Sequence, residues 1–308
     1  MDALTLIAPI ARDNGGVLTR SQVLATGVSA RVLSELVSTG SVARIARGVY
    51  AVGDPLPEPR RIANGWYAVI SYQSAVAWHG VDLPTPLTQI HVTVPRHRGR
   101  YAEAVAGVRL HRADLARTDV EFRNGALVTT PLRTCLDIAR HAPIDQAVAI
   151  IDAFIRQRHF TDAEFAAVAR GAKGPGRLRI QTVAGLVDPL SGSVLESLTR
   201  VLLWREGLPI PVTQLSLKSS ATGWVGFVDF AWPQLRAVLE CDGYAYHSSR
   251  EYFRRDRRRW TAITAAGWRL AVVTWFDVTQ DPAYVVTAVR RLLDLGAEAN
   301  TNVTRAAS

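Results

Sequence analysis

Two short apolar runs near the C-terminus carry three acidic residues between them. Asp229 lies within residues 228–232, and Glu240 and Asp242 lie within residues 238–243. Both runs read as buried strands, and an unpaired buried charge costs several kcal/mol or shifts its pKa until the group is neutral. We therefore expect these acids to have a use, and the commonest use of clustered carboxylates is to hold a divalent metal.

Strand geometry makes this expectation more specific. Side chains along a strand alternate between its faces, so Glu240 and Asp242 point the same way. The four-residue break between the runs is short enough for a hairpin loop that pairs Trp232 with Ala237. In that register Asp229 lies directly opposite Glu240, where like charges are destabilising and a bound cation would reverse the sign. A one-residue shift would remove the site, and the alternative is a solvated hairpin edge with unrelated acids.

Length and composition describe a folded, multidomain protein. The chain has 308 residues, with 48% hydrophobic and 20% charged residues, which suits two or three globular domains. No apolar run reaches the roughly 18 residues that span a bilayer, and the first residues lack the basic region of a signal peptide. The cysteines Cys135 and Cys241 suit reduced, buried thiols. The sequence therefore predicts a cytoplasmic protein without a membrane partner.

The charge balance indicates nucleic acid as a partner. The formal net charge is +9, and such basicity usually serves a polyanion. The basic residues are almost all arginine, since Lys173 and Lys218 are the lysines of the chain. A GC-rich genome explains that preference equally well, so the choice of arginine is not itself evidence for phosphate contacts.

The first fifty or so residues read as three helices followed by a small hairpin. Thr19 and Ser29 are placed to cap helices ending near residues 24 and 39, and the hairpin follows at residues 41–52. This order predicts a winged helix-turn-helix over residues 1–54, although many small helical domains share it. Glu35, on the exposed face of the groove-facing helix, counts against tight DNA contact. The DNA contacts expected from this domain are Arg31, Arg44 and Arg47.

A mixed α/β middle region is expected over residues 60–190, after a stiff proline-rich linker at residues 55–59. Its basic loop at residues 96–100 is either a phosphate contact or a solvated turn, and its histidines lack metal-ligand spacing. The expected helices are at residues 71–78, 131–140, 145–156 and 162–170, and the expected strands are at residues 90–94 and 108–111. The sequence as a whole thus predicts an α+β multidomain protein.

From residue 191 the expected order is helix, three strands, helix, strand and helix, followed by a disordered tail at residues 296–308. This order and its acids resemble the PD-(D/E)XK nuclease fold, and more closely the branch related to very-short-patch repair endonucleases. The resemblance implies a restriction-endonuclease-like αβββαβ domain over residues 191–295 that binds Mg²⁺ or Mn²⁺. The matching pieces are Ser193-x-x-Glu196, Val228-Asp229-Phe230, Glu240-x-Asp242-Gly243, His247 and Phe253-x-x-Asp256-x-x-Arg259.

The resemblance also implies roles for individual residues. Asp229 and Glu240 would be metal ligands, with the carbonyl group of Cys241 as a third. Glu196 would bind the metal or orient a water molecule, although Ser193-x-x-Glu196 is also an ordinary capping box. His247 would be a general base or a leaving-group acid, or else a surface histidine.

One departure from the nuclease pattern concerns the position two residues after Glu240. Asp242 stands there in place of the usual lysine, and it could join the metal site or leave the enzyme incomplete. Lys218 or Arg255 could substitute for the lysine. Otherwise metal-bound hydroxide and His247 must suffice. The implied catalytic set is Glu196, Asp229, Glu240, Asp242 and His247.

Residues 250–259 contain six arginines and two acids, interleaved with aromatic residues. This mixture favours contact with nucleic acid through phosphate pairing and base stacking, and the alternative is a solvated helix face. Asp256 either belongs to the family pattern or pairs with Arg259 on its own helix. The DNA contacts expected here are Arg254, Arg255 and Arg258.

Several short stretches of the N-terminal half form a second family pattern. They are Leu18-Thr19-Arg20, Arg47-Gly48-Val49-Tyr50, Ser71-x-x-Ser74-Ala75, His79-Gly80 and Pro131-Leu132-Arg133-Thr134-Cys135-Leu136-Asp137. With these stretches the N-terminal half resembles the AbiEi-type antitoxins of bacterial abortive-infection systems, which are type IV toxin–antitoxin systems. The resemblance implies a winged helix that binds promoter DNA and represses its own operon, with a cognate toxin encoded nearby.

Two hypotheses of function follow. The first is a Mg²⁺-dependent endonuclease in phage defence or DNA repair, which hydrolyses phosphodiester bonds while the winged helix holds DNA. The alternative is an AbiEi-type antitoxin and autorepressor that carries a catalytically inactive nuclease fold.

Overall fold

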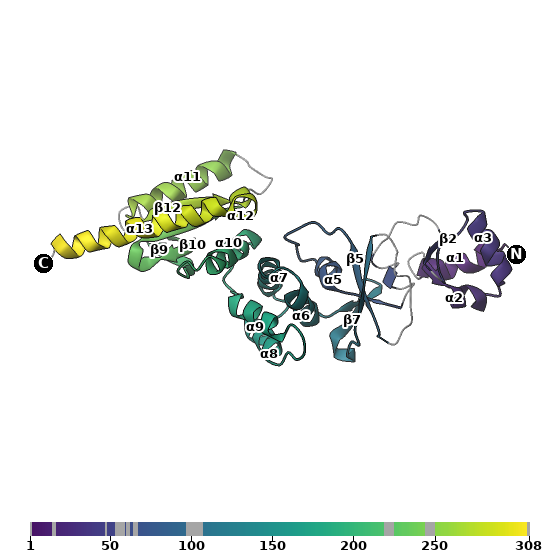
Figure 1. Cartoon of the computed structure of the whole chain (residues 1–308). Helices are drawn as coiled ribbons and strands as arrows, with labels where there is room; N and C mark the ends of the chain where they lie inside the picture. The colour runs from purple at the N-terminus through teal and green to yellow at the C-terminus, as the bar shows by residue number, and fades with distance from the viewer. Residues whose placement is uncertain are drawn as a thin grey trace. The chain divides into compact units, whose positions relative to one another are not determined.

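The computed structural model describes residues 2–13, 17–46, 48–52, 59, 62–63, 67–96, 107–218, 225–243 and 250–306. The chain divides into two compact units, Met1–His141 and Ala142–Ser308, and the described residues form three β-sheets with helices around them (Figure 1). The protein is thus of mixed α+β class. The division after His141 falls inside the range 60–190, and the ranges 1–54, 60–190 and 191–295 remain predictions as domains.

The N-terminal part of the first unit contains α1 (Ala3–Asp13), β1 (Val17–Thr19), α2 (Arg20–Ala25), α3 (Ala30–Ser38), β2 (Ala43–Ala46) and β3 (Val49–Ala51). Its strands form an antiparallel sheet in the order β1-β3-β2. Thr19 caps α2 in a capping box with Gln22, and the Ser29 side chain caps α3 by accepting from the Val32 backbone. Both caps were expected from the sequence. Helices and sheet enclose a core that includes Ile7 and Leu33.

The second sheet of this unit has the order β6-β5-β4-β8-β7. Asn124 and Gly125 connect β7 to β8 with φ angles of 51° and 80°, the positive values that a two-residue hairpin turn requires. This hairpin was not expected from the sequence, although Asn-Gly is its usual signal. The elements are β4 (Val69–Ile70), α5 (Tyr72–Trp78), β5 (Ile90–Val94), β6 (Val108–Arg112), η1 (Arg117–Asp119), β7 (Val120–Arg123), β8 (Ala126–Thr129) and α6 (Pro131–His141).

The second unit begins with helices and continues into the third sheet, whose order is β12-β11-β10-β9. Strands β9, β10 and β11 are antiparallel, and β12 is parallel to β11. The helices before the sheet are α7 (Ile144–Arg156), α8 (Asp162–Arg170), α9 (Arg177–Leu186) and α10 (Val194–Arg205). The remaining elements are β9 (Val212–Lys218), β10 (Val225–Trp232), η2 (Pro233–Leu235), β11 (Ala237–Asp242), α11 (Arg250–Ala265), β12 (Arg269–Thr274), α12 (Trp275–Gln280) and α13 (Pro282–Ala306).

Helices cover both faces of this sheet. On one face Phe230 and Leu239 pack in a core shared with α10, α12 and α13. On the other face Ala231 and Val238 pack against Ile263 of α11. Because side chains alternate along a strand, apolar residues on both faces give the continuous hydrophobic runs that were read as buried strands.

Three expectations for this unit need correction. Helix α13 continues to Ala306, where a disordered tail was expected. Helices α9 and α12 were not anticipated. Apolar residues 227 and 228 were expected to belong to a buried strand, and Val228 is buried, whereas Phe227 is 59% exposed.

The cysteines are free thiols, with Cys135 buried and Cys241 partly buried. Within the described parts of the chain, no helix has both the length and the apolar character needed to cross a bilayer.

Candidate functional site

The hairpin formed by β10 and β11 brings two of the predicted acids together. Trp232 pairs with Ala237 and Phe230 pairs with Leu239, so the predicted pairing is confirmed. Continuing that register by one residue sets Asp229 opposite Glu240. The turn η2 and Arg236, whose φ is 45°, close the hairpin.

The Asp229 carboxylate is held by donors from both neighbouring strands. Its Oδ2 accepts from the backbone N–H of Cys241 at 2.8 Å, and its Oδ1 accepts from Nε2 of Gln214 at 3.2 Å. Burial, and after it the negative charge of Glu196, raises the pKa of Asp229 to about 6. The carboxyl group therefore holds a proton more readily than an ordinary aspartate.

The Glu240 carboxylate is paired with an arginine of α11. Nη2 of Arg259 lies 2.9 Å from Oε2 and 3.1 Å from Oε1 of Glu240, and it also donates to the backbone oxygen of Phe227. Burial and the nearby charge of Asp229 raise the pKa of Glu240 above its usual value, against the opposing effect of Arg259. This buried acid therefore has a cationic partner already.

Glu196 comes from the first turn of α10 and, with the partly buried Asp229 and the buried Glu240, completes a group of three carboxylates. Its Oε2 accepts from the backbone N–H of Gly192 at 2.8 Å and from Nε2 of Gln214 at 2.9 Å. The Ser193 side chain accepts from the Glu196 backbone at 3.1 Å. The capping-box expectation is thus half right, because Ser193 caps the helix while the Glu196 side chain reaches Gly192 and Gln214.

Gln214 links two of these acids and was missed by sequence reasoning. It lies on β9 at the position opposite Asp229, between the pairs Val228–Leu215 and Phe230–Thr213. Its φ of 51° is unusual for a residue with a side chain in a strand. A strained conformation persists where its surroundings hold it, and such residues cluster at functional sites. Its strand mixes polar and apolar residues, so nothing in the sequence singled it out.

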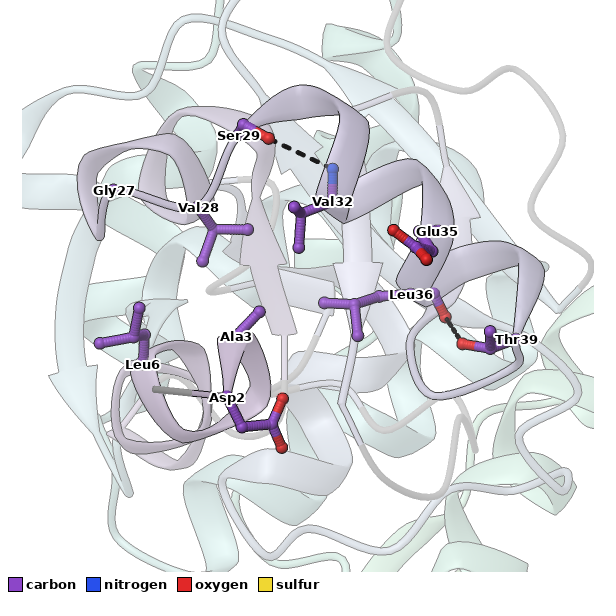
Figure 2. Close-up of a pocket in the computed structure, with 10 residues that line it drawn as sticks. All are labelled: Asp2, Ala3, Leu6, Gly27, Val28, Ser29, Val32, Glu35, Leu36 and Thr39. Carbon is purple, nitrogen blue, oxygen red and sulfur yellow. Dashed lines mark hydrogen bonds between the residues drawn. The ribbon is translucent and has the colours of Figure 1, made fainter.

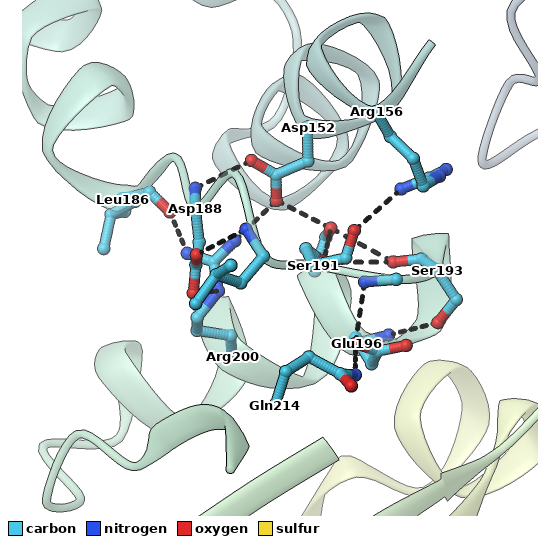
Figure 3. Close-up of polar contacts among 12 residues, drawn as sticks. Asp152, Arg156, Leu186, Asp188, Ser191, Ser193, Glu196, Arg200 and Gln214 are labelled. Carbon is cyan, nitrogen blue, oxygen red and sulfur yellow. Dashed lines mark hydrogen bonds and ion pairs between the residues drawn. The ribbon is translucent and has the colours of Figure 1, made fainter. Parts of the chain in front are cut away.

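A buried polar network positions the loop that precedes Glu196 (Figure 3). Asp152 of α7 pairs with Arg200 of α10 and accepts from the Ser197 hydroxyl at 2.7 Å and from the Asp188 backbone at 2.9 Å. Ser197 in turn contacts Ser191 at 2.8 Å. Asp152 and Arg200 were not singled out from the sequence, although an acid inside the apolar run of α7 is a visible signal. The network connects α7, α10 and the loop between α9 and α10.

The oxygen donors of this site suit a hard divalent cation such as Mg²⁺, and its three carboxylates outnumber the guanidinium of Arg259 that pairs with Glu240. Within the described residues, however, no set of three or more acidic, histidine or cysteine side chains has a metal-binding arrangement. The carbonyl oxygen of Cys241 accepts from the Gly243 backbone, and the Cys241 thiol lies 3.5 Å from the Thr199 hydroxyl.

Other predicted residues have different outcomes. Asp242 is partly buried on β11. Lys218 ends β9 and is exposed. His247 lies outside the described residues, as does Arg47, and the side chains of Arg254 and Arg255 also lie outside the description. Arg258 is exposed on α11, and the Arg257 guanidinium lies 5.8 Å from the centre of the Trp260 ring.

The N-terminal part has two exposed arginines and a pocket whose lining includes two acids. Arg31 is exposed on α3, and Arg44 is exposed on β2. A pocket of about 540 Å³ lies between α1 and α3 (Figure 2), and its charged lining residues are Asp2 and Glu35. Glu35 lies one helical turn after Arg31, so the two exposed side chains share a face of α3. An acid therefore stands beside the arginine that is expected to contact DNA.

Two segments of the chain match known protein families. Residues 6–53 match the family described as a transcriptional regulator, AbiEi antitoxin. Residues 67–185 match the AbiEi antitoxin C-terminal domain. The chain therefore carries the N-terminal and C-terminal domains of AbiEi antitoxins, in agreement with the resemblance found in its N-terminal half. The resemblance of residues 191–295 to nucleases remains a prediction.

Related proteins occur in Mycobacterium tuberculosis. Uncharacterized protein MT2308 (strain CDC 1551 / Oshkosh) and Uncharacterized protein Rv2248 (strain ATCC 25618 / H37Rv) are each 28% identical over 263 residues, covering 84% of this chain and 94% of the relative. The crystal structure of the RV2827C protein from Mycobacterium tuberculosis aligns with a TM-score of 0.40 and 15% identity, covering 72% of this chain and 90% of that one.

Proposed function

We propose that this protein is a DNA-binding antitoxin and transcriptional regulator whose N-terminal part acts as a winged helix-turn-helix. The observation that carries the proposal is the match of residues 6–53 to the AbiEi transcriptional regulator family. The exposed Arg31 on α3 and Arg44 on β2 supply cations where such a domain meets the DNA groove and backbone. Because antitoxins act with toxins, we expect a cognate toxin encoded nearby as a second partner.

The test is binding to the DNA upstream of the gene, measured by fluorescence anisotropy over a range of salt concentrations. Arg31→Ala and Arg44→Ala should each weaken binding. Each lost phosphate contact should make the decrease of log K with log salt shallower, by about 1 in the slope. Arg170→Ala is the control, because Arg170 is an exposed arginine at the end of α8. Binding that is independent of salt, or equal effects of all three substitutions, would contradict the proposal.

A second candidate function is hydrolysis of phosphodiester bonds by the second unit. The observation that favours it is the group of buried carboxylates, since burial and mutual repulsion raise the pKa values of Asp229 and Glu240. These two residues would hold a Mg²⁺ or Mn²⁺ ion, which supplies charge neutralisation and an activated water when bound. Glu196 and Gln214 would keep Asp229 in place, and Arg258 on the surface of α11 would attract the DNA backbone.

Cleavage of plasmid and single-stranded DNA in the presence of Mn²⁺ tests this second candidate. Asp229→Asn and Glu240→Gln should abolish cleavage while DNA binding is retained. Asp294→Asn is the matched control, because Asp294 is an exposed acid of α13. Cleavage that survives both site substitutions would show that the activity has another source.

A further inference from the structure

Strand β7 lies at the edge of the second sheet. Among the described strands it pairs with β8 alone, at one end of the order β6-β5-β4-β8-β7. Its Phe122 is 74% exposed and is the most exposed large apolar side chain in the described part of the chain. Leu127, the partner of Phe122 on β8, is 43% exposed. An edge strand with exposed apolar side chains is a template for pairing with another chain.

The hairpin turn determines which backbone groups of β7 face outward. The residues before and after a two-residue turn are hydrogen-bonded to each other, and here they are Arg123 and Ala126. Hydrogen-bonded and non-hydrogen-bonded pairs alternate along an antiparallel ladder, so the next pair, Phe122 and Leu127, is not hydrogen-bonded. The N–H and C=O groups of Phe122 therefore point away from β8, toward the open edge.

The residues on either side of Phe122 have charges of opposite sign. The side chain of Glu121 is 37% exposed, and Arg123 is exposed. Both lie on the same face of β7, because side chains alternate along a strand. The Glu121 carboxylate lies 3.9 Å from Nδ1 of His79, which is too long for a hydrogen bond. Its exposure and this long contact leave Glu121 open to a cation from another molecule.

We propose that β7 pairs with β7 of a second copy of this chain, antiparallel and about a two-fold axis at Phe122. In this arrangement the outward N–H and C=O groups of Phe122 in the two copies bond to each other. Glu121 of each copy lies opposite Arg123 of the other copy. Cross-strand pairs of opposite charge and of aromatic residues stabilise a sheet. The contact uses the same surface on both copies, so the assembly closes as a dimer.

The other registers of this pairing are less favourable. An axis between two residues would set an outward backbone group of one copy opposite a residue whose groups already bond to β8. An axis at Glu121 would set two glutamates opposite each other, and an axis at Arg123 would do the same with two arginines, where like charges are destabilising. The axis at Phe122 satisfies both the hydrogen bonds and the charges.

Sedimentation equilibrium of the full chain, without DNA, measures the association. Strand β7 has four residues, so the interface is small and the dimer should be weak and dependent on protein concentration. Glu121→Arg and Arg123→Glu each turn two attractive pairs into two repulsive ones, so each should raise Kd by about tenfold or more. A wild-type chain that stays monomeric up to its solubility limit would overturn the proposal.

The net charge of the chain supplies a control. The formal net charge is +9, so two copies repel each other, and replacing an arginine by glutamate lowers that repulsion. Arg170→Glu, at an exposed position at the end of α8, should leave Kd within about twofold of wild type. Arg123→Glu changes the net charge equally, so equal Kd values for these two variants would contradict a contact at Arg123.

A mixture of the two site variants tests the register. Glu121→Arg in one copy and Arg123→Glu in the other restore both charge pairs with their signs exchanged. The mixed dimer should therefore form about tenfold or more tightly than the dimer of either variant alone. The double variant Glu121→Arg/Arg123→Glu should recover the wild-type Kd for the same reason. Failure of either one to recover would exclude antiparallel pairing at Phe122.

Cross-linking gives a second measurement, which decides if circular dichroism shows that a charge variant is unfolded. Hydrogen-bonded residues opposite each other have Cα atoms about 5.5 Å apart, a distance that a disulfide spans, so Phe122→Cys should form a covalent dimer on oxidation. Leu127→Cys is the control, because its two copies would lie three strand spacings apart, about 14 Å. No cross-linking of Phe122→Cys, or equal cross-linking of both variants, would overturn the proposal.

Discussion

Asp152 contacts α10 and the loop that precedes Glu196. Replacing it by asparagine tests how much these contacts contribute to the stability of the second unit. The side chain is fully buried in α7 and pairs with Arg200, whose side chain is 7% exposed. It also accepts hydrogen bonds from Ser197 and from the Asp188 backbone. Asp152→Asn keeps the shape of the side chain, removes its charge and turns one acceptor into a donor that faces other donors.

The magnitude follows from the burial of Arg200. Removing one partner of a buried ion pair typically costs 3–5 kcal/mol, because the other charge stays buried without compensation. Asp188 lies 3.8 Å from Nε of Arg200 and retains part of the compensation. We therefore predict a loss near the lower end of that range, about 3 kcal/mol in the free energy of unfolding of the second unit.

Urea denaturation followed by tryptophan fluorescence measures this loss as a lower midpoint with an unchanged slope. Asp294→Asn removes an exposed acid and should stay within about 0.5 kcal/mol of wild type. Asp152→Leu combined with Arg200→Met should lose less than Asp152→Asn, because no charge is left unpaired. A loss below about 1 kcal/mol for Asp152→Asn would refute the reasoning.

Three further predictions concern the site and the N-terminal part. The pKa of Asp229 rises from 3.8 to about 6 on folding, so the stability of the second unit should fall as pH rises from about 4 to about 6, where the folded state keeps a proton that the unfolded state has lost. Asp229→Asn should remove the Asp229 share of that dependence in thermal unfolding and leave the share of Asp152 and Glu240, whose pKa values are also raised. Gly192→Ala places a methyl group 3.0 Å from Oε1 of Glu196, so it should destabilise the unit and weaken Mn²⁺ binding, whereas Gly185→Ala on the open face of α9 should not. Ser29→Ala removes the cap of α3 and should cost about 1 kcal/mol, measurable as a lower melting temperature together with weaker DNA binding; an unchanged melting temperature would mean that the cap contributes nothing.

Local signals in the sequence predicted much of the fold. The capping box of Thr161 and Glu164 marks the start of α8, and the helix spans Asp162–Arg170 as expected. Strands β10 and β11 coincide closely with the two apolar runs that were expected to be buried strands. The β7–β8 hairpin and the extension of α13 were missed, although the Asn124-Gly125 turn and a run free of proline were readable.

Part of the candidate site could likewise be predicted from the sequence, and part could not. Alternation along strands and a short hairpin loop were enough to pair Trp232 with Ala237, and so to bring Asp229 and Glu240 together. The hydrogen-bond partners of those acids were harder to predict from the sequence. Gln214 meets Glu196 and Asp229 from a backbone conformation with a φ of 51°, and local sequence patterns do not encode that geometry.

Local patterns in the sequence were enough to predict acids in a hairpin of apolar strands, caps at Thr19, Ser29 and Ser193, and a basic chain. These properties depend on neighbours within a few residues, or on composition. Helix packing in the folded protein, in contrast, sets the contact of Arg259 with Glu240 and that of Asp152 with Arg200. Those pairs are separated by 19 and 48 positions in the chain, and their contact depends on how whole helices pack, which no local periodicity records.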